Sequence, residues 1–371
     1  MTSKDKILIG LVDADLLNGG TRHPNLVLLK LAGFLTDNAI PFRLIIDKDE
    51  NIMEYTTIYM SKVFSFTPDP PFYEKVKKTP NENKFKIGGT GDYAIKKDIK
   101  DFKSSRTRDM NQLENDIFLN NYPNKRGGKK KWGIDMCRQM PYYHLYDEYI
   151  QSKIKAGRKK SYFNDYLYYS IGFLTRGCIR HCPFCVNKLE NKVYRYSELE
   201  WFLDDERNEK GDLIRPYIYL WDDNFLAAPK EIWQPMLQSL IDSKRPFQFR
   251  QGLDERILAE SEDGEEIAQM LSKCKYHGDF IFAFDNWRDR DKIIKALKIW
   301  KRHNSKRGTK FYLFCGYTLK SGEDEKLYND IKILFERIKI LMQYGCFGYV
   351  MRHADYVNHK LSNIYVQIAR W

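Results

Sequence analysis

The feature that most restricts the fold of this chain is a regular alternation of apolar strands and amphipathic helices in its second half. The runs that favour buried strands are rich in aromatic and β-branched residues, and they lie at 168–174, 217–221, 247–251, 280–284, 311–315 and 347–351. The stretches with apolar residues at helical spacing lie between them, at 197–205, 230–241, 265–273, 289–300 and 324–342. Six consecutive strand candidates separated by helices indicate repeated βα units.

Repeated βα units predict an α/β fold with parallel strands, because a crossover helix is needed to bring the chain back to the start of the next strand. Eight such units form a complete TIM-type barrel, so six predict a partial (βα)6 barrel over residues 163–371 with a short C-terminal tail. In such barrels the chemistry is concentrated at the carboxyl ends of the strands. We therefore looked for functional residues directly after each strand candidate.

The amino-terminal segment, residues 1–91, favours a second α/β unit. Residues 6–12 are an apolar strand candidate, residues 26–35 repeat apolar side chains at helical spacing, and residues 42–46 favour another strand. The order strand, helix, strand implies a right-handed crossover, which is typical of a doubly wound, Rossmann-like sheet. A later strand candidate at 84–87 is followed by a glycine cluster, which is a weak sign of ligand binding because turns also use glycine.

A basic segment joins these two parts of the chain. The protein carries 62 Lys and Arg residues against 50 Asp and Glu residues, a formal net charge of +12. Residues 75–165 hold 22 of the basic and 11 of the acidic residues, so this segment accounts for +11 of that charge. The periodic patterns stop over residues 92–162, which we interpret as a basic linker or insertion on the surface.

A local positive charge favours an anionic partner. Aromatic residues that could stack on unpaired bases are interleaved with the charge, namely Phe85, Tyr93, Phe102, Tyr122, Trp132, Tyr142 and Tyr143. Aromatic residues make up 15% of the whole chain, however, so a solvated linker anchored by its rings accounts for the same pattern. Nucleic acid and a peptide or small-molecule substrate both stay open, and neutralising Lys129, Lys130 and Lys131 would separate a substrate-guiding surface from a linker.

The composition also bears on the compartment. No apolar run approaches the ~20 residues that a membrane-spanning helix needs. The first apolar run is short and is followed by Asp13, unlike the apolar core and cleavage site of a signal peptide. Seven cysteines without an export signal suit metal binding, catalysis or burial better than paired disulfides. We therefore expect a cytoplasmic protein that does not bind a membrane.

Three cysteines follow the first strand of the predicted barrel. Cys178, Cys182 and Cys185 have a C-x3-C-x2-C spacing within the sequence GCIRHCPFC. A loop of this length can wrap around one corner of an iron–sulfur cube, supply three of its four ligands and leave the last iron open. The alternative is zinc with His181 as the fourth ligand, although structural zinc sites mostly place two ligand pairs far apart in the sequence. The spacing favours an iron–sulfur cluster and leaves zinc open.

This loop, with Phe184 before its last cysteine, resembles that of the radical S-adenosylmethionine superfamily. The resemblance spans roughly residues 168–352, as expected for six βα units. The sequences GFLTRG at 172–177, DDNF at 222–225 and QGLD at 251–254 are similar to those of the subset with an amino-terminal cobalamin-binding-type domain.

The resemblance implies a [4Fe-4S] cluster held by the three cysteines. S-adenosylmethionine would chelate the open iron through its methionyl amine and carboxylate, and its reductive cleavage would yield a 5′-deoxyadenosyl radical that abstracts hydrogen from a substrate. The backbone near Phe184 would lie along the adenine. An electron donor such as flavodoxin or ferredoxin is implied as a partner.

The resemblance also assigns residues around S-adenosylmethionine. Asp222 and Asp223, after the second strand, would contact the methionyl amine, although the family's Gly-Gly-Glu motif is absent here. Gln251 and Asp285, after the third and fourth strands, match positions that bond the ribose hydroxyls, and Arg256 is a candidate partner for the methionyl carboxylate. Each acid could instead cap the helix that follows it, and Arg256 could be a solvated residue of a first helical turn.

We do not expect cobalamin to bind, because the subset's Asp-x-His-x-x-Gly loop does not occur; His23, in the first βα turn, can equally be a residue of the helix start. Two functions remain. The first is a radical S-adenosylmethionine enzyme that modifies a substrate such as nucleic acid or peptide. The second is an iron–sulfur nucleic-acid-binding module without catalysis. The spacing of the motifs assigns neither the residue that acts on the substrate nor the reaction outcome.

Overall fold

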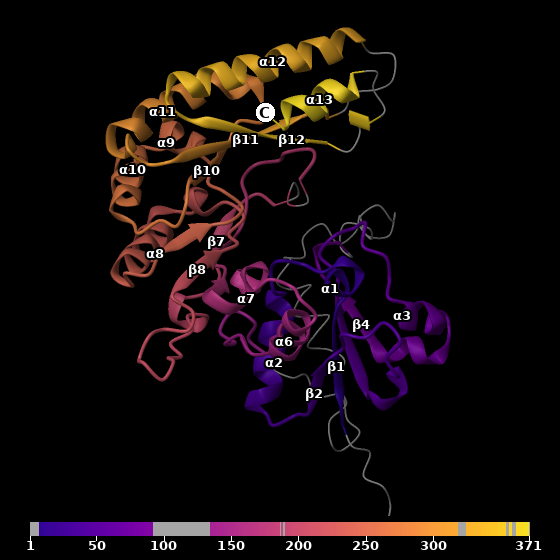
Figure 1. The fold of residues 1–371 in the computed structure, drawn as a ribbon. Coiled ribbons are helices and arrows are strands. Elements are labelled where there is room, and N and C mark those ends of the chain that lie inside the picture. The colour runs from indigo at the N-terminus through magenta and orange to yellow at the C-terminus, as the bar shows by residue number, and fades with distance from the viewer. Residues whose placement is uncertain are drawn as a thin grey trace, which may run out of the picture. The chain divides into compact units, whose positions relative to one another are not determined.

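We describe the protein from a computed structural model, in which the described residues are 7–91, 134–185, 187, 190–317, 324–353, 356–357 and 361–370. The chain is a mixed α/β protein with parallel sheets and is divided into two compact units (Figure 1). Unit 1 contains Met1–Tyr169 and Glu200–Arg215, and unit 2 contains Ser170–Leu199 and Pro216–Trp371. The chain therefore passes between the units three times.

Unit 1 is built on a four-stranded parallel sheet with the strand order β2-β1-β3-β4. The strands are β1 (Ile9–Asp13), β2 (Phe42–Leu44), β3 (Thr57–Ser61) and β4 (Phe85–Gly88). The strands predicted near residues 6–12, 42–46 and 84–87 are confirmed. The strand β3 was not predicted, because its five residues, TIYMS, begin and end with polar side chains; all five are buried because β3 lies between β1 and β4.

The helices of unit 1 are α1 (Ala14–Gly19), α2 (Leu26–Asp37), α3 (Pro71–Val76), α6 (Asp147–Lys155) and α7 (Asn164–Tyr168), with short 3-10 turns at Ile52–Glu54, Pro80–Lys84 and Lys160–Phe163. The helix α2 confirms the prediction at 26–35. Its leucines share one core cluster with Tyr146, Ile150 and Phe163, all of them almost fully buried.

This packing changes the interpretation of the predicted linker. Residues 134–162 are part of unit 1, and the Lys30 ammonium of α2 is buried and donates to the Met136 carbonyl at 2.6 Å. The sequence did not indicate this role, because α6 has only three apolar residues, Tyr149, Ile150 and Ile154, among six polar ones. Residues 92–133, which hold 11 of the 22 Lys and Arg residues of the basic segment, Lys129, Lys130 and Lys131 among them, lie outside the described residues.

The contact between α2 and Met140 predicts that one methyl group added to α2 strongly lowers stability. A Cβ atom added at Gly33 would lie 2.1 Å from the backbone oxygen of Met140. We therefore expect Gly33→Ala to destabilise the protein by about 1–3 kcal/mol, the usual cost of overpacking, measured by urea unfolding. Gly19→Ala is the control, because a Cβ there has no neighbour within 4 Å. Equal stability of the two variants would contradict this packing.

Unit 2 contains two three-stranded sheets, with the orders β5-β8-β9 and β10-β11-β12. The strands are β5 (Tyr169–Gly172), β8 (Tyr217–Leu220), β9 (Phe247–Phe249), β10 (Phe280–Ala283), β11 (Thr309–Cys315) and β12 (Phe347–Arg352). The pairs β8–β9, β10–β11 and β11–β12 are parallel, and a parallel bridge joins Phe247 to Tyr276. All six predicted strands are confirmed. A short antiparallel hairpin, β6 (Thr175–Gly177) with β7 (Val193–Arg195), encloses the cysteine loop.

The helices of unit 2 are α8 (Lys230–Asp242), α9 (Arg256–Glu260), α10 (Gly264–Lys273), α11 (Arg290–Asn304), α12 (Asp324–Gln343) and α13 (Ser362–Ile368). Four of the predicted helices match α8, α10, α11 and α12. The helices α9 and α13 were not predicted, because each is a single short segment between turns. Among the described residues, no helix is long and apolar enough to cross a membrane.

The helix predicted at 197–205 is wrong. The structure has only a 3-10 turn there, Leu199–Trp201, and the residues from Glu200 onward pack in unit 1. The Phe202 carbonyl accepts a hydrogen bond from the Tyr143 hydroxyl at 2.6 Å, and Arg215 donates to the Tyr143 carbonyl at 3.3 Å. These long-range contacts replace the helical hydrogen bonds of the segment.

Candidate functional site

The polar side chains predicted to be functional follow successive strands of unit 2. The cysteine loop comes directly after β6, Asp222 and Asp223 follow β8, Gln251 follows β9, and Asp285 follows β10. Because the carboxyl ends of parallel strands lie at one edge of a sheet, this placement gathers the loop and the acids on the same side of unit 2. The contacts of Asp223 and Asp254 with the loop, described next, agree with this placement.

The cysteine loop is folded back on itself by hydrogen bonds. The Cys185 amide donates to the Cys182 carbonyl at 2.9 Å. Two backbone amides point at sulfur atoms, that of Arg180 at Cys178 Sγ (3.3 Å) and that of Asn187 at Cys185 Sγ (3.4 Å). The three thiols are half-buried. Sulfur atoms that accept backbone hydrogen bonds and stay partly accessible are typical of thiolate ligands of a metal cluster.

The three thiols influence one another electrostatically. Burial is the main reason why the pKa values of the Cys178 and Cys182 thiols are raised. Cys185 raises both values further, and Cys178 raises that of Cys182, whereas the Arg256 guanidinium lowers the latter. Within the described parts of the chain, no three His, Cys, Asp or Glu side chains are arranged to hold a metal ion. Because their pKa values are raised, the Cys178 and Cys182 thiols are predominantly protonated, and a cation that binds them would have to displace their protons.

Asp223 accepts hydrogen bonds from both ends of the cysteine loop. Its carboxylate accepts from the Gly177 amide at 3.0 Å and from the Asn187 side-chain amide at 2.8 Å, and Arg176 lies 3.4 Å away. Gly177 itself has a φ of +97°, and a Cβ there would lie 2.2 Å from the Lys192 oxygen. Only glycine therefore fits at the entry to the loop.

Asp254 joins the loop to the ends of β8 and β9. Its buried carboxylate accepts from Arg180 Nε at 2.7 Å, from Asn224 Nδ2 at 3.2 Å and from Arg256 Nε at 2.7 Å. Asn224 Nδ2 also lies 3.4 Å from Cys178 Sγ. Arg180 is held in addition by Glu260 at 2.5 Å. The network fixes the loop from three separate elements.

No protein-family model matches this chain. No curated protein matches it either. The site is therefore interpreted from its own residues, and we compare each predicted position with its contacts.

Asp222 is buried and serves the loop that precedes the cysteines. It accepts from the Thr175 amide at 2.6 Å, from the Thr175 hydroxyl at 2.7 Å and from the Leu174 amide at 3.2 Å. Burial raises the pKa of its carboxyl to about 7, against these hydrogen bonds, which lower it.

The pKa of Asp222 predicts a pH dependence. Because the pKa is raised on folding, the folded state binds the proton more tightly, so stability falls as the pH rises from about 4 to about 7. Asp222→Asn keeps an acceptor for Thr175 and removes the ionisation. We expect the stability of the wild type, relative to this variant, to decrease between pH 5 and pH 8 in urea unfolding. The control is Asp291→Asn, which should show no such trend because the Asp291 side chain is 89% exposed. A stability difference between the wild type and Asp222→Asn that stays constant with pH would contradict the burial of the charge.

The other four predicted residues differ in their surroundings. Phe184 is 38% exposed, and its ring lies 4.2 Å from that of Phe314 at the end of β11. Asp285 accepts from the Phe314 amide at 2.9 Å, and burial raises its pKa. Arg256 is bound by Asp254 and by Asp289, the latter at 2.9 Å. Gln251 is exposed in a turn after β9.

Sequence reasoning did not single out Asp254, Asn224 and Arg180 as residues of the site. Asp254 and Asn224 follow strands β9 and β8, so the rule of looking after each strand could have found them, and Arg180 lies between two of the cysteines. Glu255 was also missed; it is fully buried beside Asp254, accepts from the Ala283 amide at 3.1 Å, and burial raises its pKa well above the usual range.

Proposed function

We propose that this protein is a radical S-adenosylmethionine enzyme, with unit 2 as a partial (βα)6 TIM-type barrel and unit 1 as a Rossmann-like domain. From β8 to β12 the strands of unit 2 alternate with helices, and the neighbours β8–β9 and β10–β11–β12 are parallel. The bridge from Phe247 to Tyr276 brings the chain before β10 next to β9. These features support one curved, continuous arrangement.

The observation that carries the proposal is the cysteine loop held at the carboxyl ends of these strands. Three thiols lie in one loop, two of them accept backbone amides, and Asn224 and Arg256 place a polar donor and a positive charge beside them. This donor set suits a [4Fe-4S] cluster with three protein ligands. When bound, the cluster and S-adenosylmethionine would supply a 5′-deoxyadenosyl radical that abstracts hydrogen from the substrate.

The role of the chain is then to bind, orient and shield. The rings of Phe184, Phe314 and Tyr317 form one aromatic group, with Phe184 to Tyr317 at 5.7 Å, against which an adenine could pack. Asp285 and Gln251 stay proposed for the ribose, and Arg256 for the methionyl carboxylate. Asp222 and Asp223 stay proposed near the methionyl amine, but their contacts with Thr175 and Gly177 also support a positioning role.

The substrate is proposed as a macromolecule, nucleic acid or peptide, because of the basic segment 75–165. Flavodoxin or ferredoxin is the proposed electron donor, the cytoplasm the proposed location, and cobalamin is left out of the proposed cofactors. The second candidate, an iron–sulfur nucleic-acid-binding module without catalysis, is favoured by the same segment. Zinc in place of the cluster would use His181, whose side chain is exposed beside Cys182.

Anaerobic reconstitution tests the proposal. The protein is loaded with iron and sulfide, reduced with dithionite, and incubated with S-adenosylmethionine, and 5′-deoxyadenosine and methionine are measured by chromatography. We expect both products in equal amounts. A loaded protein that releases neither, with dithionite and with reduced flavodoxin, overturns the catalytic proposal. Salt-sensitive nucleic-acid binding that is unchanged by Cys178→Ala would then favour the second candidate.

A further inference from the structure

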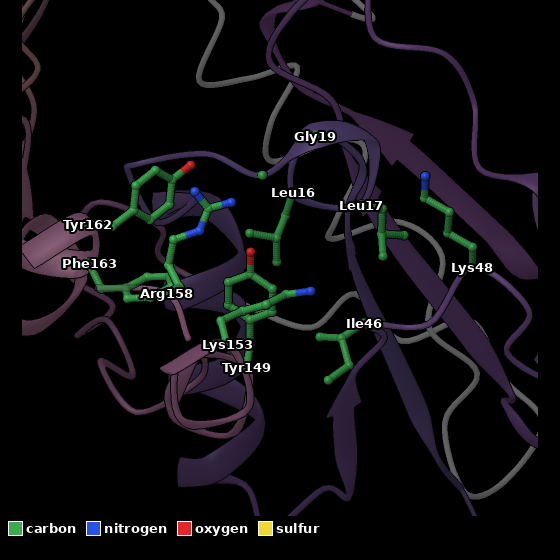
Figure 2. A pocket seen from close by; sticks show the side chains of 11 residues that line it. Leu16, Leu17, Gly19, Ile46, Lys48, Tyr149, Lys153, Arg158, Tyr162 and Phe163 are labelled. Atoms are coloured by element: carbon green, nitrogen blue, oxygen red, sulfur yellow. The ribbon is translucent and has the colours of Figure 1, made fainter. Parts of the chain in front are cut away.

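Unit 1 has a pocket of about 330 Å³ at the carboxyl ends of β1 and β2 (Figure 2). One wall is the segment after β1, from Leu16 to Gly20, and the loop after β2 contributes Ile46 and Lys48. The opposite wall comes from α6 and the turn that follows it. The sheet is parallel and open, with the order β2-β1-β3-β4, and such sheets bind ligands at the carboxyl ends of their strands. The volume lies at the lower end of the ~300–1,000 Å³ of small-molecule sites.

Three positive side chains line this pocket from three places in the sequence, with Lys48 on the opposite side from Arg158 (Figure 2). Lys48 comes from the loop after β2, Lys153 from the last turn of α6, and Arg158 from the following turn. All three are exposed. Among the residues that the structure describes, none of them has an Asp or Glu oxygen within ion-pair distance, whereas Lys62, Lys77 and Arg256 elsewhere in the chain all do. The three cations are therefore not held in ion pairs with described acids, although Asp47 and Asp49 flank Lys48 in the sequence.

The floor of the pocket is apolar and aromatic. Leu16, Tyr149 and Phe163 line it, and each is buried in the core of unit 1. Two phenol hydroxyls meet at its glycine edge: a Cβ at Gly20 would lie 3.5 Å from the Tyr162 hydroxyl and 3.6 Å from that of Tyr149. Gly20 has a φ of +82°, a backbone conformation that favours glycine. Because glycine has no side chain, this edge of the pocket stays open.

The two tyrosines are also linked to the cations. The Arg158 guanidinium lies 4.7 Å from the centre of the Tyr162 ring, and the Lys153 ammonium lies 5.5 Å from that of Tyr149. The aromatic rings thus hold both cations at the pocket instead of in free solution. The pocket combines an apolar floor, two hydroxyls, two cations held against aromatic rings and a third cation, Lys48.

We propose that this pocket binds a nucleoside monophosphate unit, with the phosphate among Lys48, Lys153 and Arg158 and the ring system over the apolar floor. Arginine and lysine together suit a dianionic phosphate, because the guanidinium donates two parallel hydrogen bonds and the ammonium groups add point charges. The two tyrosine hydroxyls can bond the sugar. The proposal uses only residues of unit 1 and does not depend on the cysteine loop.

The source of the unit is either a free nucleotide or the 5′-phosphorylated end of a nucleic-acid strand, and calorimetric titration of the full-length protein distinguishes them. The probes are the four ribonucleoside 5′-monophosphates, adenosine without phosphate, inorganic phosphate, and a short single-stranded oligonucleotide with and without a 5′-phosphate. We expect at least one monophosphate, or the phosphorylated oligonucleotide, to bind at least tenfold more tightly than adenosine, inorganic phosphate and the unphosphorylated strand.

Variants of matched charge test the residues. Lys153→Gln and Arg158→Gln should each weaken that binding about tenfold or more, since each removes a charge-assisted contact. Lys155→Gln removes the same charge from the same helix, outside the pocket, and should leave the affinity within twofold. Lys153, Lys155 and Arg158 are exposed, so thermal unfolding should be unchanged in all three variants. Absence of binding by every probe, or equal loss in the Lys155 variant, overturns the proposal without affecting that of the cysteine loop.

Discussion

Replacing Cys178, Cys182 and Cys185 together by alanine is expected to abolish iron binding. The loop would lose all three thiolates, and the backbone amides of Arg180 and Asn187 would have no sulfur to donate to. We expect roughly four iron atoms per chain in the reconstituted wild type, as in a [4Fe-4S] cluster, and none in the variant. Iron and sulfide assays and the visible absorption spectrum measure this, and 5′-deoxyadenosine release should be lost with the iron.

The matched control is Cys137→Ala, since Cys137 is a half-buried free cysteine of unit 1. It should keep full iron content. Thermal unfolding of the metal-free proteins should be similar for the wild type and the triple variant, because half-buried thiols contribute little apolar area. Iron retained by the triple variant would contradict the assignment of the ligands. Zinc bound in place of iron, and lost in His181→Ala, would favour the zinc alternative.

Asp254→Ala is expected to give the largest loss of stability in unit 2. The carboxylate bonds to Arg180, Asn224 and Arg256, and its removal leaves two guanidinium groups without their shared buried partner. Breaking a buried ion pair from one side costs about 3–5 kcal/mol, and we expect about 3 kcal/mol because each arginine keeps a second acid, Glu260 or Asp289. Urea unfolding monitored by tryptophan fluorescence measures the difference.

Two further variants separate charge from position. Glu260→Gln removes a more exposed partner of Arg180 and should cost at most about 1 kcal/mol. Asp254→Asn keeps the shape of the side chain, and its loss of stability should lie between those of Asp254→Ala and Glu260→Gln. We also expect Asp254→Ala to lower iron content after reconstitution, because Arg180 fixes the loop between Cys178 and Cys182. Full stability and full iron content in Asp254→Ala would show that the loop does not depend on this network.

Six strands of unit 2 could be predicted because each is rich in apolar and aromatic residues between turns, for example Phe280–Ala283, whereas the short hairpin strands β6 and β7 were not predicted. The position of the cysteine loop followed directly from them. The partners of Arg256 could not be predicted in this way. They are acids two and thirty-three residues away, and the choice between solvent and Asp254 depends on burial, which no local pattern indicates.

Unit 1 shows the same limit more strongly. The short polar-ended strand β3 is central only because β1 and β4 pair with it. Lys153 and Arg158 lie in a basic run that predicts a linker, and their position opposite Lys48 depends on a packing contact between segments about a hundred residues apart. Composition located the charge and could not assign its partner.

The three passages of the chain between the units also bear on how the protein is made. Unit 1 is complete only when Glu200–Arg215 has been added, because Phe202 accepts from the Tyr143 hydroxyl and Arg215 pairs with Asp204 at 2.6 Å. During synthesis the cysteine loop therefore leaves the ribosome before the first unit can finish folding. A fragment that stops at residue 169 would lack part of its own structure, so the amino-terminal half should be produced as residues 1–215 or together with the rest of the chain.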